Sequence, residues 1–192
     1  MAKPVEPRTL QARPSQRQEW LRRRRRIITI PFVIVAFILA RYQSEFLWLS
    51  IAMVVAGEFL RIWSAGHLHK DRILATAGPY RWIRNPLYGG SFLIAVGFCI
   101  VATSMWVWLL VSIYFLFCYL PVIQYEEGLL SQKFVEAYDL YASKVPALYP
   151  TMKPYPATDN QHFSLRQVVA NKEYNAVLGI IVAYLCLILL RA

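Results

Sequence analysis

Charged side chains are scarce in this sequence. Only 17% of the 192 residues are charged, whereas 57% are hydrophobic and 15% are aromatic. A small soluble domain could not bury this much apolar surface in one core, so most of it is expected to face lipid. The sequence contains no internal repeat. We therefore expect one membrane domain over residues 27–192, preceded by a polar tail.

Cysteine and nucleotide-binding motifs are also lacking. Cys99, Cys118 and Cys186 lie in apolar segments, at spacings that match no metal or redox motif. No G-x-G-x-x-G follows a predicted strand, which excludes a Rossmann-type cofactor site. No small-residue cleavage site follows the first apolar segment, so we expect the first helix to be retained. The sequence predicts no metal site.

Positive charge is abundant. The net charge is +10, and a run of arginines at 22–26 directly precedes the first apolar segment. Cationic residues in that position hold a helix end on the cytoplasmic side and meet anionic headgroups. No folded basic domain surrounds the run, so membrane lipids are the expected partner and nucleic acid is not. We interpret residues 1–26 as a basic tail that is disordered or lies on the surface.

Five apolar segments indicate transmembrane helices. They cover about 27–40, 46–63, 91–103, 104–124 and 176–190. Pro31 is tolerable in the first turn of the first span. Lipid leaves backbone groups no partner except in helices or closed barrels, and the segments lack the alternation of a barrel. The predicted fold is an all-α integral membrane protein of about five transmembrane helices.

The distribution of lysine and arginine sets the predicted orientation. The N-terminal part, the loop at 61–84 and the segment at 133–172 carry nearly all of these residues. These parts should face the cytosol, with the C-terminus outside, in the inner or plasma membrane of a prokaryote. Segments 64–90 and 125–175 would then form a cytosolic cap.

A rigid polar stretch, GPYRWIRNPLYGG, interrupts the apolar pattern at 78–90. Gly78 and Pro79 set a turn, and Asn85 is steered away from helical angles by the proline that follows. A helix can restart at Pro86, and its positive end would favour a carboxylate or phosphate. An interfacial belt of aromatic residues and arginines is the alternative, but a belt needs neither turn.

Two adjacent carboxylates, Glu126 and Glu127, stand at the predicted cytosolic end of the fourth span. Neighbouring side chains on a helix point in different directions, so we expect them to have different roles. The helix dipole disfavours carboxylates at a C-terminal end unless the helix continues or a cation needs them. The alternative is salt bridging to Arg81, Arg84 or Lys133.

A second charged pair lies near the end of the second span. Glu58 and Arg61 are three residues apart, so they should pair on one helix face. An ionisable residue at membrane depth is also a functional candidate. His69 and His162 are expected to be interfacial.

Two stretches together resemble a known superfamily. LATAGPYRWIRNPLY at 74–88, followed by EEGLLSQKFVEAYDLYASKVPALYP at 126–150, is similar to the isoprenylcysteine carboxyl methyltransferases and phospholipid methyltransferases, which are integral membrane enzymes. The matching positions are Tyr80, Arg84, Pro86, Tyr88, Glu126, Glu127, Tyr138, Tyr141, Val145 and Pro146. Asn85 stands where the family usually has histidine. Val122 stands where prenylcysteine methylators have arginine, which argues against a prenylcysteine carboxylate as substrate.

The resemblance implies S-adenosylmethionine as cofactor, bound in a cytosolic pocket, and a lipophilic acceptor with a carboxylate or amine headgroup. The implied cofactor-binding residues are His67, Lys70, Leu74, Ala75, Tyr80, Asn85, Pro86, Tyr88 and Glu126. A sulfonium ligand with an amino group and a carboxylate suits aromatic faces, a side-chain carboxylate and a helix start. The implied catalytic residues are Arg84, Asn85 and Glu127, with Glu127 or Arg84 facing the acceptor.

Two other functions stay open at this stage. Membrane sterol and enone reductases share a related C-terminal arrangement and use NADPH, and Arg72, Arg81 and Arg84 could meet its phosphates. A membrane scaffold without catalytic activity is the other alternative. Binding of S-adenosylmethionine or of NADPH would discriminate among the three.

Overall fold

The computed structural model describes residues 16–41, 43–69, 73–156 and 162–189, and all regular structure within them is helical. The elements are α1 (Gln16–Leu39), η1 (Ser44–Phe46), α2 (Leu47–His67), η2 (Gly78–Arg81), α3 (Pro86–Ala102), α4 (Met105–Tyr114), η3 (Phe115–Tyr119), α5 (Leu120–Lys144), α6 (Leu165–Ala170) and α7 (Tyr174–Leu189). The all-α prediction is confirmed. η3 is a π-helical turn, so α4, η3 and α5 form one continuous helix from Met105 to Lys144.

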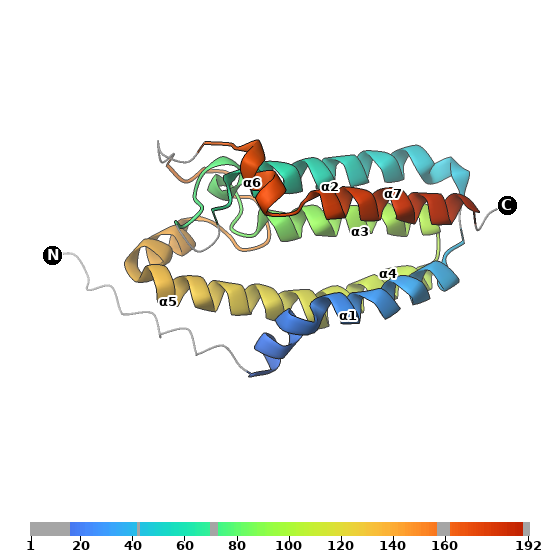
Figure 1. The fold of residues 1–192 in the computed structure, drawn as a ribbon, viewed down its shortest axis with the longest axis horizontal. Helices are drawn as coiled ribbons and strands as arrows, with labels where there is room; N and C mark the ends of the chain where they lie inside the picture. The colour runs from blue at the N-terminus through green and yellow to red at the C-terminus, as the bar shows by residue number, and fades with distance from the viewer. Residues whose placement is uncertain (1–15, 42, 70–72, 157–161, 190–192) are drawn as a thin grey trace.

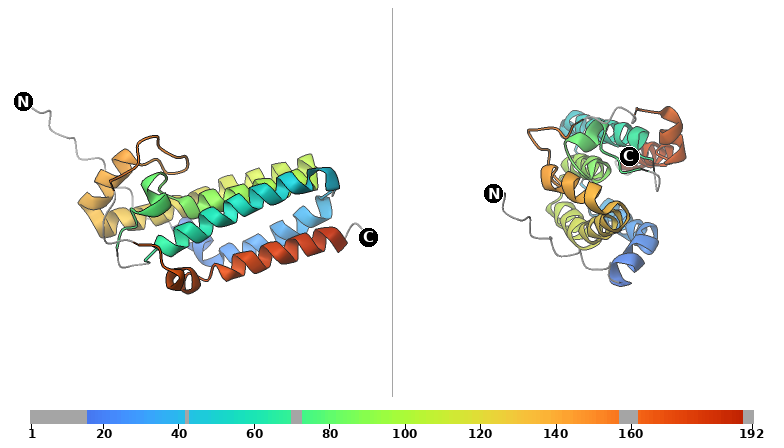
Figure 2. Two further views of the ribbon diagram at one scale, coloured as in Figure 1. Left: turned by 90° about the horizontal axis from the view of Figure 1, so that it is seen from above. Right: turned by 90° about the vertical axis from the view of Figure 1, so that its left-hand side faces the viewer.

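The long helices run alongside one another in two groups (Figure 1). α2, α3 and α7 form one group, and α1 with α4 and α5 forms the other. The α1–α2 and α3–α4 connections lie at one end with the last turn of α7. The loop before α3, the second half of α5 and α6 lie at the opposite end, as Figure 2 also shows. We call this second end the cap.

Among the described residues, two helical stretches are long and apolar enough to cross a membrane, Ser44–His67 and Met105–Lys144. Ile27–Leu39, Pro86–Ala102 and Tyr174–Leu189 are shorter apolar helices. These helices coincide with the five apolar segments of the sequence. Many large apolar side chains on them are exposed, including Trp48, Val55, Phe59, Trp106, Phe117, Leu178 and Leu185. Apolar surface of this extent is typical of contact with lipid.

The first helix begins earlier than the sequence analysis predicted. α1 starts at Gln16 and includes the arginine run at 22–26, so Pro31 lies inside the helix. The prediction that Pro31 occupies a first turn is wrong. The segment before it is rich in Arg and contains two Gln, which are strong helix formers, and the apolar stretch continues the same helix.

The fourth apolar segment also continues beyond its predicted end. α5 extends to Lys144, which places Glu126 and Glu127 in the middle of a helix rather than at its C-terminus. No proline follows Pro121 within α5, and the buried Gly128 does not end it. The helix dipole therefore does not oppose the two carboxylates. The backbone leaves helical geometry at Val135, where α5 kinks within the cap.

Close packing of α2 on α3 positions the helix start that follows the rigid loop. A Cβ at Gly57 would lie 2.6 Å from the Gly90 carbonyl oxygen, and one at Gly90 would lie 2.5 Å from the Gly57 oxygen. Only glycine permits this approach of the two backbones. α3 begins at Pro86, as predicted, and ends at a tight turn in which Thr103 has a φ of 43°.

Candidate functional site

The rigid loop meets the glutamate pair through Asn85. Its side-chain Nδ2 donates hydrogen bonds to Glu127 Oε1 at 2.8 Å and to the Ala147 carbonyl oxygen at 3.2 Å. The backbone N–H of Arg84 donates to the Pro146 carbonyl oxygen at 2.9 Å. Three segments that are distant in sequence, the loop, the middle of α5 and residues 145–147, are thereby joined in the cap.

Arg84 also pairs with Glu127. Its Nε lies 3.2 Å from Oε1, without the alignment of a hydrogen bond, and an Nη atom lies 3.5 Å from Oε2. Both side chains are largely buried, with 15% and 13% of their surface exposed. Arg84, one of the three cations that the sequence offers as salt-bridge partners for the glutamate pair, thus pairs with Glu127. The three residues implied as catalytic, Arg84, Asn85 and Glu127, form one cluster.

A group of buried tyrosines supports this cluster. The Tyr141 hydroxyl donates to the Tyr80 carbonyl oxygen at 2.6 Å, and the Arg84 guanidinium lies 5.9 Å from the centre of the Tyr138 ring. Leu74 packs against the buried cluster formed by Tyr138, Tyr141 and Val145. The Tyr138 hydroxyl is buried and has no hydrogen-bond partner among the described residues. A polar group in that state is available to a ligand.

Burial raises the pKa of Tyr80, Tyr138 and Tyr141 above the usual value for tyrosine. For Tyr80 the neighbouring Tyr141 and the carboxylate of Glu126 add to the effect of burial on the pKa. For Tyr138 and Tyr141 burial is again the largest cause, and the Arg84 charge partly opposes the rise of both pKa values. The charge of Glu126 thus acts on the Tyr80 hydroxyl.

Other residues implied for the cofactor lie around the same loop. Ala75 and Pro86 are buried, and Tyr88 is buried with its ring edge-on to Tyr119, the centroids 5.4 Å apart. The backbone N–H of Tyr88 donates to the Asn85 carbonyl oxygen at 3.1 Å. Lys70 lies outside the described residues.

His67 has a packing role in this arrangement. Its Nδ1 lies 2.9 Å from the Trp63 carbonyl oxygen, within the last turn of α2. A Cβ added at Gly78, whose φ is +57°, would lie 2.6 Å from the His67 ring. The turn before α3 therefore rests directly on this imidazole, and only glycine fits there.

Residues 145–155 belong to the site although the sequence analysis assigned them no individual contacts. The N–H of Thr151 donates to the Trp82 carbonyl oxygen at 2.8 Å, and the N–H of Tyr155 donates to that of Arg81 at 2.9 Å. Arg81 Nε in turn donates to the Tyr155 carbonyl oxygen at 2.7 Å. The segment thus covers the rigid loop. The prolines and tyrosines of YPTMKPYP, at 149–156, were the sequence feature that could have indicated this role.

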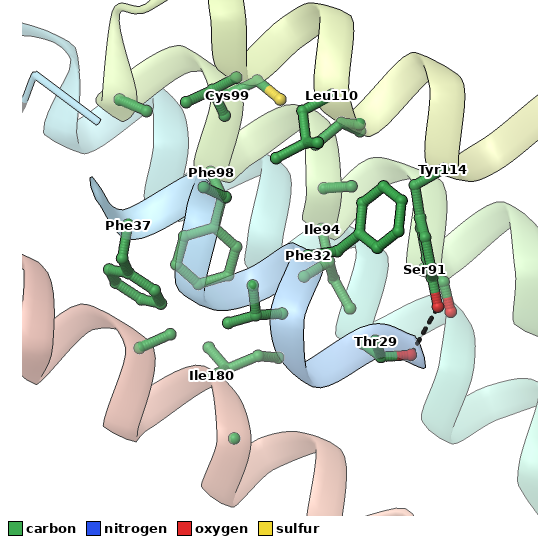
Figure 3. A pocket seen from close by; sticks show the side chains of 18 of the residues that line it. Thr29, Phe32, Phe37, Ser91, Ile94, Phe98, Cys99, Leu110, Tyr114 and Ile180 are labelled. Atoms are coloured by element: carbon green, nitrogen blue, oxygen red, sulfur yellow. Dashed lines mark hydrogen bonds between the residues drawn. The ribbon is translucent and has the colours of Figure 1, made fainter. Parts of the chain in front are cut away.

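A large cavity lies between the helices and extends from Thr29 and Ser91 to Ala40 and Ala102, at the end opposite the cap (Figure 3). Its volume is about 760 Å³, and α1, α3, α4 and α7 supply most of its wall. The oxygen- and nitrogen-bearing side chains of the wall are Thr29, Arg61, Ser91, Tyr114 and Tyr119. Thr29, Ser91 and Tyr119 are the lining residues nearest the cap on their respective helices, and the Thr29 and Tyr114 hydroxyls are 2.5 Å apart. The cavity is polar towards the cap and apolar beyond it.

An ion-pair cluster lies at the polar end of the cavity, where Arg61 and Ser91 are part of the wall. Arg61 donates to Ser91 Oγ at 2.5 Å and to Glu173 Oε2 at 2.6 Å, and its Nε lies 3.5 Å from Glu58 Oε2. The predicted pairing of Glu58 with Arg61 is confirmed. Glu173 was not predicted as a partner, because it lies directly before α7 and helix spacing does not connect it to Arg61 on α2.

The profile of the phospholipid methyltransferase family matches residues 34–137. The chain belongs to this family. The matched region contains the rigid loop and Glu126 and Glu127. No solved structure matches.

Three curated proteins are similar over about two thirds of the chain. The nickel-cobalt-cadmium resistance protein NccN of Alcaligenes xylosoxydans is 31% identical over 65% of this chain and 62% of its own length. The cobalt-zinc-cadmium resistance protein CzcN of Cupriavidus metallidurans is 26% identical over 67% and 63%. The protein-S-isoprenylcysteine O-methyltransferase of Schizosaccharomyces pombe is 32% identical over 64% and 56%. The chain thus spans less than two thirds of each relative.

Proposed function

We propose that this protein transfers the methyl group of S-adenosylmethionine to a lipophilic acceptor at the cytosolic face of a membrane. The observation that carries the proposal is the Asn85–Glu127 hydrogen bond, which assembles the family loop and the glutamate pair into one site. This site lies at the same end of the helices as the polar end of the cavity. A water-soluble cofactor and an apolar acceptor could therefore meet there.

The residues of the cap fit S-adenosylmethionine chemically. Tyr80 and Tyr88 offer aromatic rings and Glu126 a carboxylate, which suit a sulfonium cation and an ammonium group. The buried Tyr138 hydroxyl, without a partner among the described residues, is a further group that a ligand could satisfy. When bound, the cofactor supplies an activated methyl group. We assign to Glu126 the role of binding the cofactor.

The chain's own contribution is positioning and exclusion of water. Arg84 and Asn85 both engage Glu127, which fixes the loop on α5. The Tyr88–Tyr119 contact joins the start of α3 to the wall of the cavity. An acceptor whose tail lies in the cavity would thus present its polar end towards the cap, which lowers the entropy cost of reaction. A carboxylate acceptor is already ionised at pH 7, whereas an ammonium acceptor must first lose a proton.

We also propose a membrane orientation. The five apolar helices would cross the membrane, with the cap and the arginine run of α1 in the cytosol and the end of α7 outside. Arginines that flank a span favour the cytosolic side. In this orientation the polar end of the cavity points towards the cytosolic surface, where the cofactor is available.

The names of the relatives leave the acceptor open. Nickel, cobalt, zinc and cadmium resistance are named for NccN and CzcN, and isoprenylcysteine methylation for the yeast enzyme. For this chain, the residue at the arginine position of prenylcysteine methylators is Val122, which is fully buried. We therefore infer an acceptor other than prenylcysteine.

Label transfer tests the proposal. The purified protein would be incubated with S-adenosylmethionine carrying tritium on its methyl group and with a lipid extract of its host. We expect label in an organic-soluble product, and at least tenfold less with Asn85→Ala. Glu136→Gln, an exposed position on the same helix α5, is the matched control and should retain activity. A folded parent protein that labels no lipid fraction would overturn the proposal.

A further inference from the structure

One face of α7 lines the cavity along its length. The residues are Ala176, Gly179, Ile180, Ala183 and Leu187, which recur at helical spacing. A Cβ built on Gly179 has no atom within 4 Å, so it would enter open space. Glycine in a helix interior is destabilising relative to alanine. Here it leaves unfilled a volume that almost any side chain would occupy.

The rest of the wall is graded in polarity. Phe37, Phe98 and Cys99 line the part farthest from the cap, whereas Thr29 and Ser91 line the part nearest to it (Figure 3). The residues named on α1 and α3 follow the same order from polar to apolar. A ligand that fits this gradient has one polar end and one long apolar end.

The length of the cavity limits the apolar end. At about 1.5 Å per residue, the face of α7 from Ala176 to Leu187 is about 16 Å long. This is about half of the roughly 30 Å hydrocarbon core of a bilayer, the thickness of one leaflet. The cavity therefore matches the length of a hydrocarbon chain in one leaflet, with its apolar end directed away from the cap.

We propose that the cavity holds the hydrocarbon tail of the methyl acceptor, with its polar end at Arg61 and Ser91, and that Gly179 and Ala183 set the tail length admitted. Identifying the tail as the acceptor's rests on the proposed function. The tail site itself rests on the shape and polarity of the cavity. Bulk at Ala183 would shorten the usable cavity, and bulk at Gly179, nearer the polar end, would shorten it further.

Displacement of a fluorescent amphiphile tests the site without methyl transfer. The protein, purified in digitonin, would bind dansyl-labelled undecanoic acid, and n-octanol, n-dodecanol and n-hexadecanol would compete for it. For the parent we expect affinity to rise with alcohol length. Ala183→Phe should weaken n-hexadecanol at least tenfold while sparing n-octanol. Gly179→Phe should weaken all three.

Two variants serve as controls. Val182→Phe adds the same bulk at a side chain that is 49% exposed and does not line the cavity, so it should behave as the parent. Gly179→Ala tests the backbone alone and should fold at least as well, because alanine favours the helix. Failure of a folded parent to bind the probe, or the same length profile in Ala183→Phe as in Val182→Phe, would overturn the proposal.

Titration with S-adenosylhomocysteine separates this inference from the proposed function. Gly179→Phe should bind it as the parent does, since Gly179 lies in the cavity wall outside the cap. If the parent selects alcohols by length but transfers no methyl group, the tail site is supported and the proposed methyltransferase function is refuted. If the parent transfers methyl groups but shows no dependence on alcohol length, only the tail-site proposal is refuted.

Discussion

Asn85 Nδ2 lies 2.8 Å from Glu127 Oε1, and this hydrogen bond joins the loop before α3 to the middle of α5. Asn85→Ala should therefore lower stability by about 1–3 kcal/mol, because a buried carboxylate loses a donor. Thermal unfolding in detergent measures this. Asn85→His, which restores the residue usual in the family and keeps a ring N–H donor, should recover most of the loss. If alanine were as stable and as active as asparagine, the hydrogen bond would have no role in assembling the site.

Tyr138 and Tyr141 provide a matched pair. Tyr141→Phe removes a 2.6 Å hydrogen bond to the Tyr80 carbonyl oxygen and should lower stability by about 1 kcal/mol. Tyr138→Phe removes a buried hydroxyl without a partner among the described residues, so stability should stay the same or rise. Affinity for S-adenosylhomocysteine should instead fall in Tyr138→Phe, which should bind it more weakly than the parent does. Equal melting temperatures for both variants would contradict the assignment.

The cluster around Arg61 predicts different effects for its two carboxylates. Glu173→Gln should lower stability by about 1–3 kcal/mol because it weakens a 2.6 Å charge-assisted hydrogen bond that holds α7 to α2. Glu58→Gln should have a smaller effect, since neither Glu58 oxygen has a hydrogen-bond partner among the described residues. Melting temperatures of the two variants decide the matter. A larger loss from Glu58→Gln would mean that Glu58 is what anchors Arg61.

Alkaline pH should unfold the cap. The pKa values of Tyr80, Tyr138 and Tyr141 are raised, chiefly by burial, whereas tyrosines of the unfolded chain ionise near pH 10. Below about pH 10 both states keep these protons and stability is unaffected. Above it only the unfolded state releases them, so stability falls with pH by up to about 1.4 kcal/mol per unit for each group. Tyrosinate absorbance should rise together with loss of helix, and Tyr138→Phe should make the fall with pH shallower. Ionisation of these tyrosines in the folded state would contradict this prediction.

The sequence predicted the helices because apolar length is a strong local signal. It also predicted the restart at Pro86, because proline and the residue before it restrict the backbone at that point. The two wrong predictions in the fold concerned the ends of helices. The start of α1 and the end of α5 lie in polar, helix-forming sequence where hydropathy falls but the helix continues.

The site was predictable where a family pattern covered it. Arg84, Asn85 and Glu127 came from that pattern, and the structure brings them together. Glu173 and Tyr155 were not predicted as partners, because their contacts join segments far apart in sequence and carry no periodic signal. The cavity was equally out of reach, since its wall is assembled from separate helices.

The central claim is that the loop and the glutamate pair form one site for S-adenosylmethionine. Isothermal titration of S-adenosylhomocysteine into the parent, Glu126→Gln and Glu136→Gln tests it most directly. We predict saturable binding by the parent and by Glu136→Gln, and at least tenfold weaker binding by Glu126→Gln, a difference of about 1.4 kcal/mol or more. Equal affinity in all three proteins, or binding of NADPH by a folded parent that does not bind S-adenosylhomocysteine, would contradict it.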